Sequence, residues 1–398
     1  MIPYGRQDIS QSDIDAVVAA LTSDFLTQGP AVPAFEAAVA NYVGASFAVA
    51  VNSATSALHV ACLALGVGRG DLVWTSPNTF VASANCALYC GADVDFVDID
   101  PLTWNLCPVR LAEKLAIAKQ LGRLPKVVIP VHLCGQSCDM AAIGALAMIY
   151  GFKVIEDASH AIGASYGEVP VGRCAHSDIT VFSFHPVKII TTTEGGLATT
   201  QDAELARRMQ MFRSHGITRD ASEMTHAPDG PWYYQQIELG FNYRMTDVQA
   251  ALGLSQMTRI DTFITRRREI ASRYDAALKA LPLGLPHVLQ SCASSWHLYV
   301  IRVAAKSHLA MFEAMRSEGL GVNLHYIPVP SQPYYRTLGH DPELYLNAMA
   351  FYREAISIPV YAGMSNDDVA TVIEIVTRLA HQHVQVQSDN ALAHANGV

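Results

Sequence analysis

One lysine of this chain lies in surroundings that could make its amine reactive. Lys188 follows the stretch Val-Phe-Ser-Phe-His-Pro-Val (181–187), which is typical of a buried strand broken by a proline. The six other lysines fall in amphipathic helical patterns or near turns, where a solvated ammonium is expected. At a strand end, a desolvated lysine loses its proton more easily, and its neutral amine can form a Schiff base. An ordinary loop lysine that reaches water explains this stretch alone equally well.

A second candidate feature is the turn Asn-Ser-Ala-Thr-Ser-Ala at residues 52–57. An apolar strand over 47–51 precedes this turn, and a helical pattern through Leu58 and Leu65 follows it. Small hydroxyl residues at such a turn leave backbone N–H groups free at the positive end of a helix, which suits a phosphate. An ordinary N-cap made by Ser or Thr is the commoner explanation when this turn is seen alone.

Two further strand ends carry an acid and an aromatic side chain. The strand over 153–155 ends in Glu-Asp-Ala-Ser-His, and Asp157 is the first polar residue that could reach past the strand end. Its alternative role is to cap the next turn. Phe80 follows the strand over 72–75 and could present its ring at the same edge of a sheet.

Together these four features suit a phosphorylated aldehyde with a pyridine ring. The helix start would hold the phosphate, and the aromatic side chain would stack on the ring. The carboxylate would keep the ring nitrogen protonated, and the lysine would bind the aldehyde and move protons. Their order along the chain is similar to that of pyridoxal-phosphate enzymes with an aspartate aminotransferase-like fold.

The elements that would position these residues alternate between strands and helices. Apolar strands are expected over 47–51, 72–75, 94–97, 127–131, 153–155 and 178–184, with helices between most of them. This alternation predicts a mostly parallel sheet covered on both faces. A first helix over 10–21 carries the apolar stripe Ile14, Val17, Val18 and Leu21, and the long irregular stretch 214–236 is expected to be functional.

The pattern changes after the turn at 282–286. Strands over 296–303 and 322–326, a short strand within 354–360 and helices over 309–318 and from Ser365 onward indicate a smaller α+β unit. We therefore expect an α/β protein with three parts. These are an N-terminal arm and large cofactor-binding domain (1–260), a smaller C-terminal α+β domain (261–384) and a disordered tail (385–398).

The composition indicates a folded protein and disfavours binding to nucleic acids or membrane surfaces. Of the 398 residues, 51% are hydrophobic and 16% charged, and the net charge is −9. The eight cysteines form no CxxC pair, so we expect free thiols in a reducing compartment and no metal. Residues 1–10 are polar, and no apolar run is long enough to span a bilayer, so we expect a soluble, cytoplasmic protein.

Four longer motifs make the resemblance specific. The segments 52–58, 156–164, 183–196 and 242–251 resemble the signatures of the DegT/DnrJ/EryC1/StrS family of pyridoxal-phosphate-dependent sugar aminotransferases. The resemblance extends from Tyr4 to about Leu379 and implies the fold type I (aspartate aminotransferase-like) architecture. Within the family, segments 4–7, 26–30, 212–217 and 251–256 are most similar to the pseudaminic acid branch. That branch aminates C4 of a UDP-linked 4-keto-6-deoxy-N-acetylhexosamine, with L-glutamate as donor.

The resemblance also implies roles for individual residues. Lys188 would be the catalytic residue, forming the Schiff base and moving the proton. The cofactor-binding residues would be Ala54, Thr55, Phe80, Asp157, His160, Ser183, Lys188 and Asn242. The residues lining the nucleotide-sugar site would be Tyr4, Leu26, Thr27, His325 and Tyr326. Asn242 would reach the cofactor phosphate of the neighbouring subunit, which implies a homodimer with shared active sites.

The chain departs from the family pattern at three positions. It has Ile189 where many members have Pro, Thr193 where many have Gly, and His160 where many have Gln. His160 is open to a second explanation, as a packing histidine without a role in proton transfer. The alternatives for the whole chain are an aminotransferase for another nucleotide-linked keto sugar, an amino-acid aminotransferase, a cofactor-binding regulator, or a sugar dehydratase of the same fold. Dehydratase relatives have a histidine in place of the lysine, so Lys188 counts against that alternative.

Overall fold

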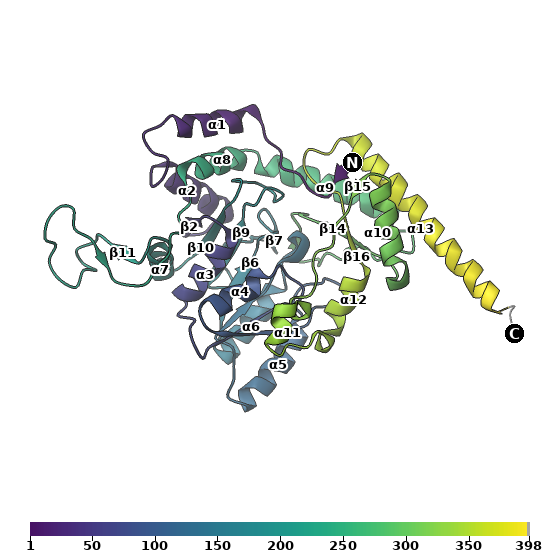
Figure 1. Cartoon of the computed structure of the whole chain (residues 1–398), viewed down its shortest axis with the longest axis horizontal. Helices are drawn as coiled ribbons and strands as arrows, with labels where there is room; N and C mark the ends of the chain where they lie inside the picture. The colour runs from purple at the N-terminus through teal and green to yellow at the C-terminus, as the bar shows by residue number, and fades with distance from the viewer. Residues whose placement is uncertain (396–398) are drawn as a thin grey trace.

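A seven-stranded sheet forms the centre of the molecule (Figure 1). The computed structural model describes the backbone of residues 1–395 and the side chains of residues 1–382. In spatial order the strands are β2 (Phe47–Val51), β10 (Gly196–Thr200), β9 (Ile179–Ser183), β6 (Lys153–Asp157), β5 (Val127–Ile129), β3 (Leu72–Thr75) and β4 (Asp93–Phe96). From β9 to β4 all neighbours are parallel, and β10 is antiparallel to both of its neighbours. The predicted α/β fold with a mostly parallel sheet is confirmed.

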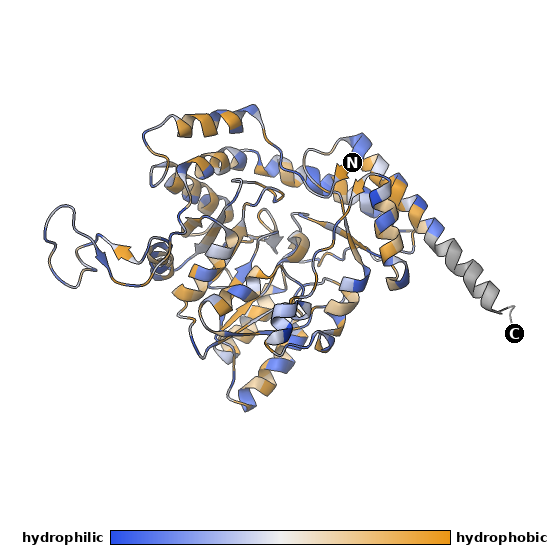
Figure 2. Ribbon diagram, in the orientation of Figure 1, coloured by the Kyte–Doolittle hydropathy of each residue, from blue (hydrophilic) through white to orange (hydrophobic). Residues whose placement is uncertain are grey.

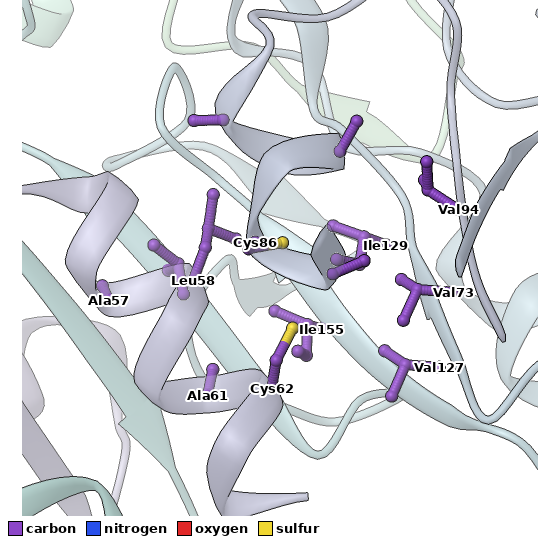
Figure 3. Packing of buried hydrophobic residues seen from close by; sticks show 14 of the residues in the cluster. Ala57, Leu58, Ala61, Cys62, Val73, Cys86, Val94, Val127, Ile129 and Ile155 are labelled. Carbon is purple, nitrogen blue, oxygen red and sulfur yellow. The ribbon is translucent and has the colours of Figure 1, made fainter. Parts of the chain in front are cut away.

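Helices cover both faces of this sheet because the strand side chains alternate between two apolar layers. Val73 and Ile155 pack in one layer with α3 (Ala54–Ala64), α4 (Ala82–Tyr89) and α7 (Ala203–Arg213), as Figure 3 shows for α3 and α4. Trp74 and Val154 pack in the other with α5 (Pro108–Gln120) and α6 (Met140–Tyr150). A third cluster joins α2 (Ala31–Val43) and α8 (Asp247–Met257) to the β2 side of the sheet.

The C-terminal elements have an apolar cluster of their own. It contains the strand pair β14 (Tyr299–Arg302) and β16 (Ala355–Ile358), helix α10 (His308–Ser317) and the start of α13 (Asn366–Ala395). Helix α9 (Ile260–Leu278) connects the two parts, because its first turns pack with α2 and its second half packs in the C-terminal cluster. At the N-terminus, β1 (Ile2–Pro3) pairs with β15 (Leu320–Gly321), so the chain start lies against the C-terminal part.

Several shorter elements complete the fold. The remaining helices are α1 (Gln11–Leu21), α11 (Pro333–Thr337), α12 (Leu346–Glu354) and the 3-10 turns η1 (Leu133–Gly135), η2 (Ala305–Ser307), η3 (Val329–Ser331) and η4 (Pro342–Leu344). A small sheet joins β13 (Cys292–Ala293), β7 (Ser165–Tyr166) and β8 (Val169–Pro170). The stretch predicted to be irregular, 214–236, contains the strand pair β11 (Ile217–Thr218) and β12 (Gln235–Gln236), whose connecting loop projects from the body (Figure 1).

Three local expectations differ from the structure. A strand over 322–326 was wrong: beyond β15 only Asn323 makes a bridge, to Ser357. Helix α13 runs to Ala395, over most of the stretch predicted as a disordered tail, and residues 396–398 lie outside the described residues. The apolar stripe of α1 faces outward. Asp13, on the inner side of the helix, is fully buried and forms an ion pair with Arg259.

Charged groups decide the orientation of α1. Asp13 also accepts hydrogen bonds from Ser255 and Gln256 of α8, so a buried carboxylate with several partners, and not an apolar stripe, attaches this helix. Apolar residues of α1 therefore remain at the periphery, as the orange segments of that helix in Figure 2 illustrate. Among the described residues, no helix has both the length and the apolar character that a membrane span requires.

Candidate active site

The candidate residues gather at the carboxyl ends of the parallel strands. β6 ends at Asp157 and β9 ends at Ser183, and these two strands are adjacent in the sheet. After β9 the chain makes a turn, in which the Lys188 N–H donates to the His185 carbonyl at 2.9 Å. The carboxyl ends of parallel strands form a common edge, and this edge is where ligands bind in α/β sheets.

Lys188 is an amine without an ion-pair partner among the described residues. Loss of solvation lowers its pKa to about 8, and the charge of Asp157 opposes this shift only in part. Its amine is therefore neutral far more often near neutral pH than that of a solvated lysine. A neutral, partly enclosed amine can attack an aldehyde and later carry a proton.

The structure separates the two acids at the end of β6. Because successive side chains of a strand alternate between faces, Glu156 and Asp157 point in opposite directions. Glu156 pairs with His132 at 2.7 Å in the interior. Asp157 accepts a hydrogen bond from the Ser83 hydroxyl at 2.6 Å and from the Ser159 N–H at 3.1 Å. It makes no ion pair with the described residues, so this carboxylate retains free acceptor sites for a cationic ring nitrogen.

His160 is held in its neutral form. The backbone N–H of Cys134 donates to its Nδ1 at 3.3 Å, so Nδ1 is an acceptor and the ring proton sits on Nε2, 3.0 Å from the Tyr326 hydroxyl. Burial, with smaller contributions from the charges of Lys188 and His325, keeps the pKa of His160 well below its ordinary value. A proton added at Nδ1 would oppose the Cys134 N–H. These contacts hold the His160 ring against the Tyr326 hydroxyl.

Side chains from the C-terminal part of the chain complete the site at the carboxyl ends of the strands. The Tyr326 N–H donates to Asn78 Oδ1 at 3.2 Å, and its ring lies 6.1 Å from that of Phe80. His325 bonds the Ser357 hydroxyl at 2.8 Å and lies 5.1 Å from the ring of Tyr4. Burial lowers the pKa of His325 to about 3. The Phe80 ring, just ahead of α4, is 58% exposed and free to stack on a ligand.

The start of α3 has donors for an anion. The Ser53 hydroxyl caps the helix by accepting from the Ser56 N–H at 3.1 Å. Within the described chain the N–H groups of Ala54 and Thr55 have no acceptor. Gly196 of β10 runs directly against this turn, because a Cβ there would lie 2.4 Å from the Ala54 nitrogen. With the neighbouring Ser183 of β9, these donors fit a phosphate group at the positive end of α3.

Leu26, Thr27 and Asn242 all lie near the N-terminal end of α8. Thr27 makes a bridge to Thr246, and the Leu26 carbonyl accepts from the Asp247 N–H at 3.0 Å, so both residues lie at the start of α8. Asn242 precedes this helix and has an exposed side chain. No backbone hydrogen bond or β-bridge between described residues joins these three positions to Lys188.

The structure adds residues that the sequence did not indicate. Ser83 binds Asp157, Asn78 holds Tyr326, and the ring of His297 lies 4.4 Å from that of His160. His297 is buried, and its Nδ1 has no partner. The sequence signal for His297 was a histidine within an apolar strand pattern, Trp-His-Leu-Tyr (296–299).

Strained backbone accompanies the site. Cys134, next to His160 in space, has a φ of 60°, and Trp296, just before His297, has a φ of 52°. Thr193, where many family members have glycine, has a φ of 67°, in the left-handed region that favours glycine. Thr193 therefore adopts a backbone conformation that glycine would adopt more easily, and this strains the backbone locally.

Comparisons with known proteins agree with this geometry. Residues 7–377 match the DegT/DnrJ/EryC1/StrS aminotransferase family. The chain is 41% identical to the spore coat polysaccharide biosynthesis protein SpsC of Bacillus subtilis over 94% of this chain and 96% of that protein. It is 38% identical to the UDP-4-amino-4,6-dideoxy-N-acetyl-beta-L-altrosamine transaminase of Campylobacter jejuni, with the same coverage.

Solved structures give the same result. Helicobacter pylori PseC, an aminotransferase involved in the biosynthesis of pseudoaminic acid, superposes with a TM-score of 0.87 at 30% identity, covering 96% of this chain and 99% of that one. The putative sugar aminotransferase Spr1654 of Streptococcus pneumoniae, in its PLP-form, gives 0.86 at 30% identity with the same coverage. The chain belongs to the DegT/DnrJ/EryC1/StrS aminotransferase family and is a pyridoxal-phosphate-dependent sugar aminotransferase.

Proposed function

We propose that this enzyme transfers the amino group of L-glutamate to C4 of a UDP-linked 4-keto-6-deoxy-N-acetylhexosamine. The product would be UDP-4-amino-4,6-dideoxy-N-acetyl-altrosamine, an intermediate of pseudaminic acid biosynthesis. The observation that carries the amino-transfer part is Lys188, a partly enclosed amine with no ion pair and a pKa of about 8, opposite the charge of Asp157. The names of the Campylobacter and Helicobacter relatives support the choice of sugar.

Each residue near Lys188 has a part in this proposal. Bound pyridoxal 5′-phosphate supplies an electron-withdrawing ring that stabilises negative charge on the carbon next to the transferred nitrogen. Lys188 binds the cofactor aldehyde and moves the proton at the sugar carbon. Asp157 keeps the ring nitrogen protonated, and Phe80 stacks on the ring, with His160 on the other side. Ser183 and the N–H groups of Ala54 and Thr55 bind the phosphate.

The exposed group at the start of α8 belongs to the second part of the proposal, a homodimer with shared active sites. In it Asn242 reaches the phosphate bound by a second copy, while Tyr4, Leu26, Thr27, His325 and Tyr326 line the nucleotide-sugar site. Support comes from exposed apolar side chains around α1 and the following loop. These side chains are Ile14, Val18, Leu21, Phe25 and Leu26. Contiguous exposed apolar surface favours association, and light scattering of the purified protein tests it directly.

The domain boundary and the cellular location are also part of the proposal. We place the boundary between the large domain (1–260) and the smaller domain (261–384) at the start of α9, because that helix packs in both apolar clusters. The cytoplasm is the proposed location, since all eight cysteines are free thiols in the structure.

The absorbance of the purified protein with bound pyridoxal 5′-phosphate tests the reaction. We expect L-glutamate to bleach the visible cofactor band with release of 2-oxoglutarate, and the UDP-linked keto sugar to restore it. A band that glutamate leaves unchanged would contradict an aminotransferase with this donor. Restoration only by a different nucleotide-linked keto sugar would favour the second candidate, for which the 41% identity to the spore coat protein is the supporting observation.

A further inference from the structure

Two hydrogen-bond donors beside the site have no acceptor within the described part of the chain, and the first is the amide of Asn78. Its Oδ1 atom accepts the Tyr326 N–H at 3.2 Å, which fixes the orientation of the amide and identifies the other atom as Nδ2. Asn78 is 1% exposed, and its Nδ2 atom is buried without a hydrogen-bond partner. A buried amide N–H without an acceptor is costly, so this position requires an acceptor that the chain itself does not supply.

The second donor is the hydroxyl of Tyr326. Its oxygen accepts the ring proton of His160, whose Nε2 atom lies 3.0 Å away, so the hydroxyl proton is available to another acceptor. Among the described residues, no acceptor takes this proton. Burial, with smaller contributions from the charges of Asp157, Cys134 and Tyr4, raises the pKa of Tyr326, so the hydroxyl remains a donor.

Tyr326 contacts both side chains that are proposed to lie on the faces of the cofactor ring. Its ring centroid lies 6.1 Å from that of Phe80 and 6.0 Å from that of His160. Under the proposed function, pyridoxal 5′-phosphate lies between Phe80 and His160. A side chain that contacts both of them lies at the rim of the space between them, so the Tyr326 hydroxyl faces an edge of the cofactor ring.

The strand order indicates which edge this is. In pyridoxal 5′-phosphate, the phosphate arm and the ring hydroxyl lie on opposite sides of the line from the aldehyde carbon to the ring nitrogen. The proposed phosphate site is formed by the start of α3 and the end of β9, on one side of β6, whose last residue Asp157 would face the ring nitrogen. Asn78 follows β3, which lies on the other side of β6. The ring hydroxyl therefore faces the side on which Asn78 and Tyr326 lie.

We propose that Asn78 and Tyr326 form a hydrogen-bonding site for the ring oxygen of pyridoxal 5′-phosphate, with Asn78 Nδ2 and the Tyr326 hydroxyl as donors. The inference rests on the proposed function and extends it to a cofactor atom that no other residue has been assigned to bind. Both donors stabilise negative charge on this oxygen. They do so most when the nitrogen that links the cofactor to Lys188 is unprotonated, because the oxygen then has no positive neighbour. The site therefore lowers the pKa of that nitrogen.

Titration of the visible cofactor band of the holoenzyme with pH tests this site. Tyr326→Phe removes the hydroxyl donor with little change of shape. Asn78→Asp keeps an acceptor for the Tyr326 N–H and exchanges the amide donor for a carboxylate oxygen. We expect each variant to raise the pKa of the band by about one pH unit. The control is Tyr335→Phe, which should leave the band unchanged, because Tyr335 is also buried and its hydroxyl donates to Asn85 at 2.6 Å.

Binding of a cofactor analogue that lacks the ring hydroxyl, 3-deoxypyridoxal 5′-phosphate, tests the same contact in the apoprotein. Quenching of tryptophan fluorescence measures the affinity for the analogue and for pyridoxal 5′-phosphate. We expect the preference of the wild type for pyridoxal 5′-phosphate to fall about tenfold in Tyr326→Phe. Other effects of the missing hydroxyl cancel, because the same two ligands are compared in both proteins.

The outcomes separate this inference from the proposed function. An unchanged band pKa in both variants, or an equal ligand preference in the wild type and Tyr326→Phe, would overturn the site for the ring oxygen alone. A wild-type protein that forms no visible band with pyridoxal 5′-phosphate would refute the whole proposed cofactor arrangement around Lys188, including this site. Neither measurement uses the sugar substrate, so both decide the inference even if the proposed sugar is wrong.

Discussion

Replacing Ser83 by alanine tests whether the carboxylate of Asp157 must be held by its neighbours for catalysis. Ser83 is fully buried, and its hydroxyl lies 2.6 Å from Asp157 Oδ2. Thr79 Oγ1 lies 2.7 Å from the same hydroxyl, so a proton from Thr79 leaves the Ser83 proton free to point at the carboxylate. Ser83→Ala removes this donor and leaves only the Ser159 N–H on Asp157.

The magnitude follows from the charge of the acceptor. A hydrogen bond to an ionised group contributes about 1.5–3 kcal/mol. If this energy positions Asp157 against the cofactor ring in the transition state, kcat should fall about tenfold to a hundredfold. The loss should not exceed that of Asp157→Asn, which removes the charge itself. KM for glutamate should change little, because Ser83 binds Asp157 and is not among the residues proposed to line the substrate site.

A matched control separates this effect from simple loss of stability. Thr75 is equally buried, and its hydroxyl donates to the Ile129 carbonyl at 2.8 Å, without contact to Asp157. Thr75→Val removes a buried hydrogen bond with little change of shape. We expect both variants to lower Tm and only Ser83→Ala to lower kcat. A Ser83→Ala enzyme with wild-type kcat, or an equal loss in Thr75→Val, would refute the reasoning.

Three further predictions concern Lys188 and Thr193. Lys188→Ala should abolish turnover while circular dichroism shows an intact fold, and turnover near the wild-type rate would contradict the assigned role. Lys188 is protonated below its pKa of about 8, and only the neutral amine reacts with the aldehyde. The rate at which apoprotein is reconstituted with pyridoxal 5′-phosphate should therefore rise about tenfold per pH unit below that value and level off above it. A flat profile would exclude the lowered pKa. Thr193→Gly should stabilise the fold by about 0.5–1 kcal/mol in urea unfolding, since relief of a left-handed threonine, about 1–2 kcal/mol, exceeds the entropic cost of glycine. Thr193→Ala keeps the Cβ and should give no gain.

Local sequence patterns predicted most of the large sheet. Leu72–Thr75 and Met140–Tyr150 have the bounds expected from their apolar periodicity, because strand and helix periods depend on neighbouring residues. The strand-end acid and lysine were recognisable for the same reason, since a polar residue that follows an apolar strand has to lie at its end. The strand predicted over 322–326 was wrong because, after the single bridge from Asn323 to Ser357, the Tyr326 N–H donates to the Asn78 side chain and not to a neighbouring strand.

The sequence by itself determined the order of strands and helices, the strand-end positions of Asp157 and Lys188, and, through its motifs, the family. Only the tertiary structure decided which of the two acids faces the site, that Ser83 holds Asp157 from 74 residues away, and that His160 is fixed as a neutral donor to Tyr326, 166 residues away. The physical reason is the separation along the chain over which each interaction acts. Periodicity and capping act within a few residues, whereas desolvation and hydrogen bonding at the site depend on segments that only folding brings together.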